Sequence, residues 1–214
     1  MNVKKCLDIL MRRLGNRTSP VLRATCLDEM ALVQAEELET MEALPWFLIS
    51  EQATTLTVPD EPRIILPTDF IMEVEDDNVT LLQDDGSIVD LEKVGYDEGR
   101  LRVPDDAEAG PPQLYSILGG YIILRPTPDL EYTLRYPSYY GRQPPPEDTE
   151  DSENQWFKWV PGLLIAKTGV VIAGEMLKDE ELTQLFGAQQ QRGMQRLENM
   201  ITAREEANRS RRMG

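Results

Sequence analysis

The chain has 214 residues, of which 41% are hydrophobic, and it contains two cysteines and no histidine. This length is enough for one elaborated domain or two small ones, and the apolar content is adequate for a core. The formal net charge of −16 is uneven, with net +5 in residues 1–23, net +3 in residues 192–214 and net −24 between them. Phosphate binding needs cationic surface, so the acidic body argues against a protein that grips nucleic acid.

The sequence carries no motif for catalysis or metal binding. Histidine, the usual acid–base group at neutral pH, is absent, and no common nucleophile, dinucleotide or phosphate-loop motif occurs. Cys6 and Cys26 lie in helix-like sequence without a CxxC spacing, which favours reduced core thiols over a disulfide or a zinc site. Asp8, Arg12 and Arg13 interrupt any signal-peptide core. We therefore expect no enzyme, no catalytic residue, no metal and no cofactor, in a protein that folds in a reducing cytoplasm.

Two helices are predicted before residue 52. The first carries an apolar stripe at helical spacing and ends at Gly15-Asn16; the stripe consists of Val3, Leu7, Leu10 and Leu14. Ser19-Pro20 begins the second helix, and Thr25 with Asp28 is a second, weaker cap. This helix is amphipathic and is predicted to end near Leu44-Pro45. The large apolar side chains that follow, Trp46, Phe47 and Leu48, are expected to clamp its end to the core.

From residue 53 the apolar period changes to two, and short runs are bounded by Pro, Gly and Asp. The pattern predicts an antiparallel meander of roughly six to nine short strands over residues 53–137. Hairpin turns are expected at Asp84-Asp85-Gly86 and Gly119-Gly120. Residues 97–112 are predicted to be an exposed loop. Pro144-Pro145-Pro146 and the acidic residues after it form a stiff linker back to the helical part.

A nearly all-apolar helix is predicted from Pro161 to Leu177. A helix that is apolar on every side must be covered on every side, by other helices or by neighbouring copies of the chain. We expect this helix to have more apolar surface than a single protomer can cover, so that copies of the chain gather around a shared axis. Lys167 interrupts a run that is already shorter than the roughly 20 residues that a membrane span needs. We therefore favour a core helix over a membrane helix.

A last long helix follows, and it becomes wholly polar after Ala203, where the chain has no apolar face to bury. The predicted class is α+β: a helical bundle with an inserted antiparallel β module and a long C-terminal helix. Residues 1–52 supply the N-terminal helices, and residues 53–143 form the inserted module. Residues 144–203 supply the linker, the central helix and the C-terminal helix, and residues 204–214 form a polar basic tail that is expected to be free.

Several motifs occur in an order that resembles one protein family. They are LPWFL (Leu44 to Leu48), IILPTDF (Ile64 to Phe70), GGYIILRPTPD (Gly119 to Asp129), YTLRYPSYY (Tyr132 to Tyr140), N-x-W (Asn154, Trp156) and P-x-LLI-x-K-x-G (Pro161 to Gly169). The series resembles the head-to-tail adaptor, or connector, proteins of tailed bacteriophages, especially those that join a portal to a short tail. The resemblance spans roughly residues 20–190, and it rests on the order of the motifs rather than on any single one.

The resemblance implies a structural protein of the virion neck, assembled in the host cytoplasm as a ring of identical subunits, commonly a dodecamer. Such a ring docks below the portal protein and carries tail tube, nozzle or tail fibre proteins. DNA passes through its lumen without specific binding, and an acidic lumen repels phosphates. No membrane is involved. A C-terminal segment of the family reaches the portal, so the candidate portal-binding residues are Arg204, Arg209, Arg211, Arg212 and Met213.

A second set of candidates contains large apolar residues expected in the core, with inter-subunit contact as the alternative, because aromatic side chains mainly fill cores. It comprises Trp46, Phe47, Phe70, Trp156, Trp159, Leu163 and Leu164. The β module is the candidate for tail-facing or lateral ring contacts, since an exposed strand edge suits pairing with another chain. The alternative function is an acidic DNA mimic that occupies a host DNA-binding protein. A glycosidase-like carboxylate pair hidden in the loops is a third hypothesis.

Overall fold

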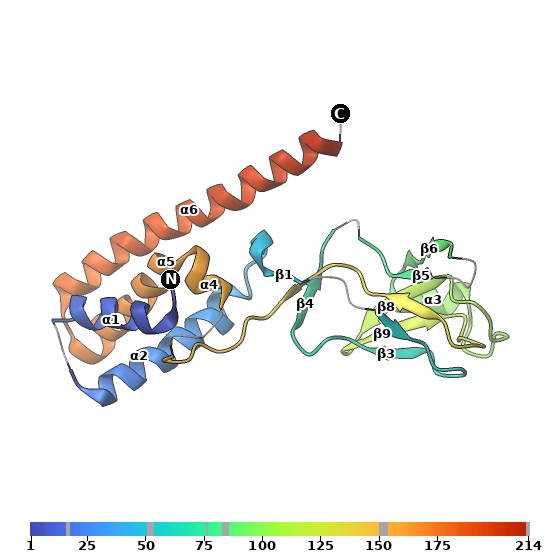
Figure 1. Ribbon diagram of the computed structural model, residues 1–214, viewed down its shortest axis with the longest axis horizontal. Coiled ribbons are helices and arrows are strands. Elements are labelled where there is room, and N and C mark those ends of the chain that lie inside the picture. The colour runs from blue at the N-terminus through green and yellow to red at the C-terminus, as the bar shows by residue number, and fades with distance from the viewer. Residues whose placement is uncertain (16–17, 51–53, 76, 83–85, 150–153, 213–214) are drawn as a thin grey trace. The chain divides into compact units, whose positions relative to one another are not determined.

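A computed structural model of the chain describes residues 1–15, 18–50, 54–75, 77–82, 86–149 and 154–212, leaving out the side chains of 205 and 208–212. The chain forms two compact units: a helical unit, Met1–Leu48 with Arg142–Gly214, and a β unit, Ile49–Gly141 (Figure 1). The predicted α+β class, with strands inserted between helices and a long C-terminal helix, is confirmed. The β unit begins at residue 49 rather than 53, because Ile49 and Ser50 already pair with its last strand.

Side-chain caps determine where the first two helices begin. The Asn2 side chain accepts a hydrogen bond from the Lys5 N–H (3.0 Å), and Ser19 Oγ accepts one from the Leu22 N–H (3.3 Å) in front of Pro20. The elements of the helical unit are α1 (Val3–Arg13), α2 (Pro20–Leu32), the π-helix η1 (Val33–Leu38), the 3₁₀-helix η2 (Trp46–Leu48), α4 (Gln155–Trp159), α5 (Pro161–Val171), the π-helix η3 (Ile172–Leu177) and α6 (Glu180–Arg212).

The second helix differs from its prediction in two ways. Thr25 is not a cap, because it lies inside α2 and its hydroxyl donates a hydrogen bond to the Val21 carbonyl (3.0 Å). The helical path ends at Leu38, not near Leu44-Pro45, after the π-helical turn of η1. The π turn of η1 holds more residues than an α turn. The helix therefore ends at two buried residues, with Leu38 as its last residue and Glu39 as its C-cap.

Helix α5 lies at the centre of the helical unit. Its residues 163–169 are all buried, and α1, α2, α4, α6 and η1 of the same chain pack against it. The buried ammonium group of Lys167 forms an ion pair with Glu37 of η1. The expectation that neighbouring copies are needed to cover this helix is therefore wrong, because the chain's own helices cover it. The η3 end is more open, and Met176 there is 49% exposed.

Helix α6 packs along α5 at close range. A Cβ atom at Gly169 of α5 would overlap the Phe186 ring of α6, and one at Gly193 of α6 would lie 3.0 Å from Leu163. Glycine therefore lets the two helix backbones approach. The helix then continues to Arg212, so the backbone of residues 204–212 is helical, and at the start of the predicted free tail Arg204 contacts the Trp46 ring. Intrahelical hydrogen bonds satisfy this backbone without an apolar face.

The β unit contains eleven short strands in three sheets, ordered β1-β11-β4, β2-β10-β5-β6 and β3-β9-β8-β7. The strands are β1 (Ile49–Ser50), β2 (Thr54–Leu56), β3 (Arg63–Ile65), β4 (Phe70–Glu73), β5 (Thr80–Leu82), β6 (Ile88–Asp90), β7 (Glu92–Lys93), β8 (Leu114–Leu118), β9 (Tyr121–Arg125), β10 (Thr133–Arg135) and β11 (Tyr139–Gly141). Sequence neighbours often lie in different sheets, and β7 pairs with β8 in parallel. The prediction of a simple antiparallel meander is therefore wrong.

Two local predictions in the β unit have different outcomes. The Gly119-Gly120 turn is confirmed: both residues have positive φ (59° and 84°) and join the antiparallel strands β8 and β9. The loop predicted over residues 97–112 is wrong at its start, where helix α3 (Tyr96–Arg102) forms. Of the predicted Asp84-Asp85-Gly86 turn, only Gly86 lies within the described residues, with φ 82° between the paired strands β5 and β6.

The two four-stranded sheets share one apolar core, which consists of Ile64, Leu66, Val79, Leu81, Leu91, Tyr115, Ile122, Leu124, Leu134 and Tyr136. Side chains alternate between the faces of a strand, so the neighbours of these core residues lie on the outer faces. Two outer rows are apolar and exposed. In the first row, Leu56 of β2, Leu82 of β5 and Ile88 of β6 are aligned, with Thr133 of β10 between Leu56 and Leu82. In the second row, Tyr121 of β9 lies between Ile65 of β3 and Leu118 of β8.

Candidate interaction sites

Four aromatic side chains from η2 and α4 meet in one cluster of the helical unit. The Phe47 ring contacts Trp156 edge-to-face (5.2 Å between centroids), and Trp46 contacts Trp159 in the same way (4.8 Å). Phe47 also stacks on Trp159 at 6.1 Å. Trp156 is fully buried, whereas Trp159 is 40% exposed. The cluster therefore runs from the core to the surface.

A buried polar network holds the start of α4 against the end of η1. Asn154 caps α4 and donates hydrogen bonds from its amide to Gln34 Oε1 (2.7 Å) and the Pro144 carbonyl (2.8 Å). Glu39 Oε1 accepts from the Trp156 indole (3.3 Å), the Gln143 N–H (3.0 Å) and the Gln34 amide (3.0 Å). Buried polar groups need such partners. The network therefore fastens the chain where it returns from the β unit.

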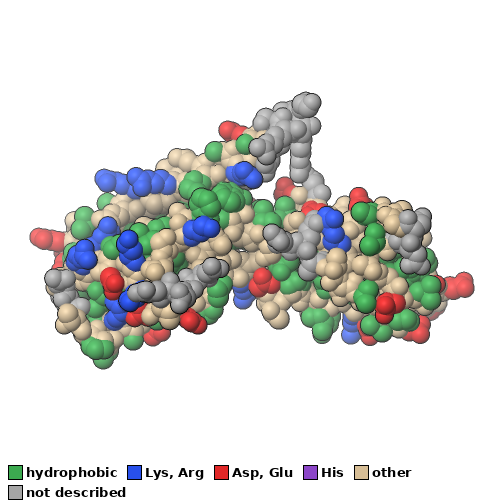
Figure 2. Space-filling model, in the orientation of Figure 1, with side chains coloured by type: hydrophobic (Ala, Val, Ile, Leu, Met, Phe, Trp, Pro, Cys, Tyr) green, Lys and Arg blue, Asp and Glu red, His purple; other side chains and the backbone are tan. Residues whose placement is uncertain are grey.

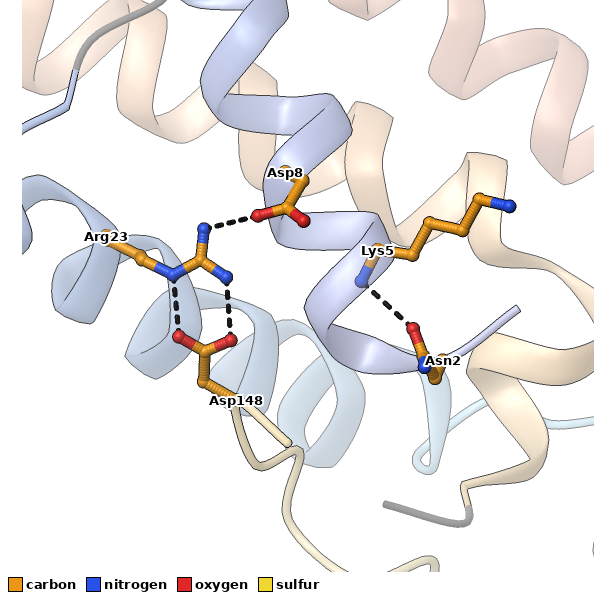
Figure 3. A network of polar contacts seen from close by, with 5 residues as sticks. All are labelled: Asn2, Lys5, Asp8, Arg23 and Asp148. Atoms are coloured by element: carbon orange, nitrogen blue, oxygen red, sulfur yellow. Dashed lines mark hydrogen bonds and ion pairs between the residues drawn. The ribbon is translucent and has the colours of Figure 1, made fainter. Parts of the chain in front are cut away.

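Arg23 makes a second junction in the helical unit (Figure 3). Its guanidinium group donates to both oxygens of Asp148 (2.6 and 2.7 Å) and to Asp8 of α1 (2.7 Å). The bidentate hydrogen bond to Arg23 lowers the pKa of Asp148, and the same bond raises the pKa of Arg23. The segment predicted to be an acidic linker is thus fixed at Asp148; residues 150–153 lie outside the described residues.

The structure separates the seven predicted core or inter-subunit residues into three kinds. Phe47, Trp156, Leu163 and Leu164 are buried within the single chain, so their surface is not available to another subunit. Trp46 and Trp159 reach the surface of the same cluster. Phe70 belongs to the β unit, where its ring packs at 5.5 Å from Tyr139. The seven residues therefore do not form one site.

The predicted portal-binding residues lie on or beyond the last turns of α6. Arg204 places its guanidinium carbon 5.5 Å from the centroid of the Trp46 ring, a cation–π contact inside the helical unit. Met213 and the side chains of Arg209, Arg211 and Arg212 lie outside the described residues. Of the five candidates, only Arg204 has a described side chain, and this side chain contacts Trp46 of the same chain.

A cationic pocket of about 450 Å³ lies where α1, α5 and α6 meet, and we call it the arginine pocket. Its basic side chains are Arg13, Arg192 and Arg196, and no carboxylate lines it. Trp159, Leu163 and Met200 are among its apolar residues. No sequence motif had indicated this pocket. The spacing of Arg192 and Arg196, one turn apart on α6, signals one basic face, but the contribution of α1 depends on tertiary packing. Figure 2 shows Lys and Arg side chains gathered over the helical unit.

A group of carboxylates, which we call the acidic patch, lies at the other end of α5. It consists of Glu29 of α2, Glu36 and Glu37 of η1, and Glu175 of η3. Partial burial, followed by the negative charges of Glu175, Glu37 and Glu36, raises the pKa of Glu29. Glu37 has a partner in Lys167, and Glu36 and Glu175 are exposed. The patch is therefore a concentration of like charge rather than a set of ion pairs.

The β unit carries an acidic groove of about 760 Å³ between β4, β7 and α3. Glu73 in this groove accepts a hydrogen bond from the Tyr115 hydroxyl (3.0 Å) and forms an ion pair with Lys93. Burial, followed by the charge of Glu73, raises the pKa of Tyr115. Among the described residues, no three His, Cys, Asp or Glu side chains are grouped to hold a metal ion.

No protein-family model matches the chain, and no curated protein sequence matches it significantly. Among the described helices, none is both long enough and apolar enough to cross a membrane.

Proposed function

We propose that this protein is a structural adaptor of a tailed-bacteriophage virion, which assembles as a ring between the portal and the tail. The observation that carries the proposal is that the motifs resembling the adaptor family meet one another in pairs. LPWFL supplies Phe47, which contacts Trp156 of N-x-W, and IILPTDF supplies β3, which pairs with β9 of GGYIILRPTPD. Phe70 of IILPTDF likewise packs against Tyr139 of YTLRYPSYY, with ring centroids 5.5 Å apart. The motifs thus support one architecture rather than a catalytic centre.

The surfaces of the two units support an interaction role. The outer rows of the β unit expose Ile65 (70%) and Ile88 (60%), and exposed apolar surface of this kind marks protein contacts. In the proposed ring, these rows contact tail proteins or a neighbouring subunit. The acidic body faces DNA without binding it, because like charges repel phosphates. The coverage of α5 within one chain gives no support to a ring, so the proposal rests on the motif pairs and on these surfaces.

The purified full chain tests the proposal when it is studied alone and mixed with isolated portal rings. Mass photometry is expected to find discrete species at multiples of the 24.4 kDa subunit, and electron microscopy is expected to find added density on one end of the portal. A chain that stays monomeric and binds no portal ring would contradict the proposal.

A variant in which Arg209, Arg211 and Arg212 are replaced by Glu tests the C-terminal contact separately. It leaves Arg204 and its contact with Trp46 in place. Portal binding is expected to fall while the far-UV circular dichroism of the folded chain stays the same. Unchanged portal binding would remove these arginines from the portal contact without excluding the adaptor function.

A further inference from the structure

The arginine pocket has a positive charge that no described carboxylate neutralises. Arg13 donates a hydrogen bond to the neutral Gln189 side chain (2.7 Å), and no described carboxylate pairs with Arg13, Arg192 or Arg196. Arg23, Arg100, Arg102 and Arg125 have acidic partners, whereas Arg12, Arg63, Arg135 and Arg142, like the pocket arginines, form no ion pair with a described carboxylate. Three arginines therefore line one pocket in which no described carboxylate is present, although the chain has 38 acidic and 22 basic residues. The pocket is thus complementary to an external anionic group.

The position of the pocket adds to its positive potential. The pocket includes Pro161 and Gly162, the first residues of α5, and α5 begins without a side-chain cap. Pro161 has no N–H, and the Leu163 N–H donates to the Val160 carbonyl (3.0 Å), so this helix end contributes the positive end of its dipole rather than a set of free donors. Arg192 and Arg196 therefore lie beside the positive end of a helix, where the chain gains no stability from placing cations. An anion from outside would relieve this repulsion.

The acidic patch has the opposite arrangement at the far end of the same helix. Glu175 lies in η3, which continues α5 to Leu177, so a carboxylate sits near the negative end of the helix. Glu175 follows Pro161 by fourteen residues along this helical path, which places it on the order of 20 Å from the pocket end of α5 at 1.5 Å per residue, and Glu37 lies nearer, beside Lys167. A single chain therefore cannot bring its own patch into its own pocket, whereas two copies can.

The apolar side chains beside the two sites are also complementary. Trp159 in the pocket is 40% exposed, while Leu32 and Met176 beside the patch are each 49% exposed. Leu32 lies one turn after Glu29, and Met176 directly follows Glu175. A contact with an apolar centre and charges around it is the usual composition of a specific protein interface.

We infer that the arginine pocket of one copy binds the acidic patch of a second copy of this chain. Because the two surfaces differ, the contact is head-to-tail, and repetition of such a contact generates a closed ring or an open filament. The inference rests on the proposed adaptor function, because the contact between pocket and patch would join neighbouring subunits of the proposed ring. It assigns that contact to charged surfaces of the helical unit.

Reciprocal charge reversal tests the inference. One variant carries Arg192→Glu and Arg196→Glu, and a second carries Glu36→Arg and Glu175→Arg; Glu37 is left intact because it pairs with Lys167. Sedimentation velocity of the full chain at low salt is expected to show self-association of the wild type. Each variant alone is expected to need about a tenfold higher concentration for the same association, because like charges then face each other.

An equimolar mixture of the two variants is the decisive measurement. Association is expected to return in the mixture, because each reversed surface then meets a complementary one, and this return also shows that both variants are folded. The matched control is Arg63→Glu with Arg135→Glu in the β unit, which makes the same change in net charge and is expected to leave association unchanged. Added salt is expected to weaken the wild-type contact.

Several outcomes would overturn the inference. The wild-type chain could be monomeric at every concentration, or each single variant could associate as the wild type does. The mixture of the two variants could fail to recover association, or the Arg63→Glu, Arg135→Glu control could lose as much association as the pocket variant. Binding of a labelled DNA duplex that is lost with Arg192→Glu and Arg196→Glu, by a chain that stays monomeric, would assign the pocket to nucleic acid instead. Failure of the adaptor function is distinguishable, because it is measured by portal binding. Self-association that depends on the arginines can persist without portal binding.

Discussion

The helical unit and the β unit differ in how completely they bury their apolar side chains. Among the described residues, the large hydrophobic side chains that remain exposed in the helical unit are Met1, Val21, Leu32, Trp159, Met176 and Leu185. The smaller β unit exposes twice as many: Ile49, Leu56, Val58, Ile65, Met72, Leu82, Ile88, Val89, Leu101, Leu118, Tyr121 and Leu130. Helices can surround α5 on all sides, but each sheet of the β unit has an outer face that lacks a second layer.

The two units therefore offer partners different kinds of surface. The helical unit completes its own core and concentrates charge at its surface, in the arginine pocket and the acidic patch. The β unit leaves apolar rows open. The two units also carry separate natural probes, because all three tryptophans lie in the helical unit and all seven tyrosines lie in the β unit. Their stabilities can therefore be measured separately in the full chain.

The largest expected effect comes from Trp156→Ala in the core of the helical unit. Trp156 is fully buried, and removing a buried Trp side chain costs about 3–5 kcal/mol of unfolding free energy. Trp159→Ala, on the same helix but 40% exposed, is the matched control and is expected to cost much less. Urea unfolding followed by the fluorescence of the remaining tryptophans measures both. Equal losses would mean that the exposed end of the aromatic cluster is as important as its buried end.

Leu134→Ala makes the corresponding change in the β unit. Leu134 lies in the shared core of the two sheets, and its truncation is expected to cost about 2–5 kcal/mol. Leu82→Ala, on an exposed outer row, is the control and is expected to have a small effect. Near-UV circular dichroism of the tyrosines reports the transition of the β unit. If Leu134→Ala shifted the unfolding midpoint measured by tryptophan fluorescence by the same amount, the two units would unfold together, and their stabilities could not be compared separately.

Gly169→Ala tests the close approach of α5 and α6. The added methyl group overlaps the Phe186 ring, and overpacking of this kind typically costs about 1–3 kcal/mol. Gly187→Ala in α6 is the control, because open space surrounds a Cβ atom there and alanine favours a helix. Thermal unfolding followed by the far-UV circular dichroism of the helices distinguishes the two variants. A neutral Gly169→Ala would show that α6 can move away from α5 without loss.

The smallest expected effect is a pH dependence at the Arg23 junction. The pKa of Asp148 is lowered by its bond to Arg23, so the pair stabilises the fold above the unfolded pKa and loses this contribution as the pH falls below about 4. The pair is partly exposed, so at most about 1 kcal/mol is expected. Asp148→Asn is expected to flatten the acid limb of stability measured by urea unfolding, whereas Asp28→Asn, on the exposed face of α2, is not. An unchanged acid limb in Asp148→Asn would contradict this account.

Local patterns in the sequence predicted much of the helical unit because the relevant forces act over a few residues. The stripe from Val3 to Leu14 predicted α1, Ser19-Pro20 predicted the start of α2, and Pro161 predicted the start of α5. The Gly119-Gly120 hairpin followed from the positive φ angles that glycine permits. By contrast, α3 and the π-helical ends of α2 and α5 were missed, because their limits depend on side chains from distant parts of the chain.

The composition and spacing of this sequence determined the α+β class, the insertion of strands between helices and the polar character of the last helix. Only the tertiary structure decided that α5 is covered by its own chain, that Lys167 pairs with Glu37, and that Arg13 joins Arg192 and Arg196 in one pocket. Apolar periodicity shows which side chains must be buried, but it does not show which segment covers them. Pairings across more than a hundred residues depend on how whole helices pack, and that information is not local.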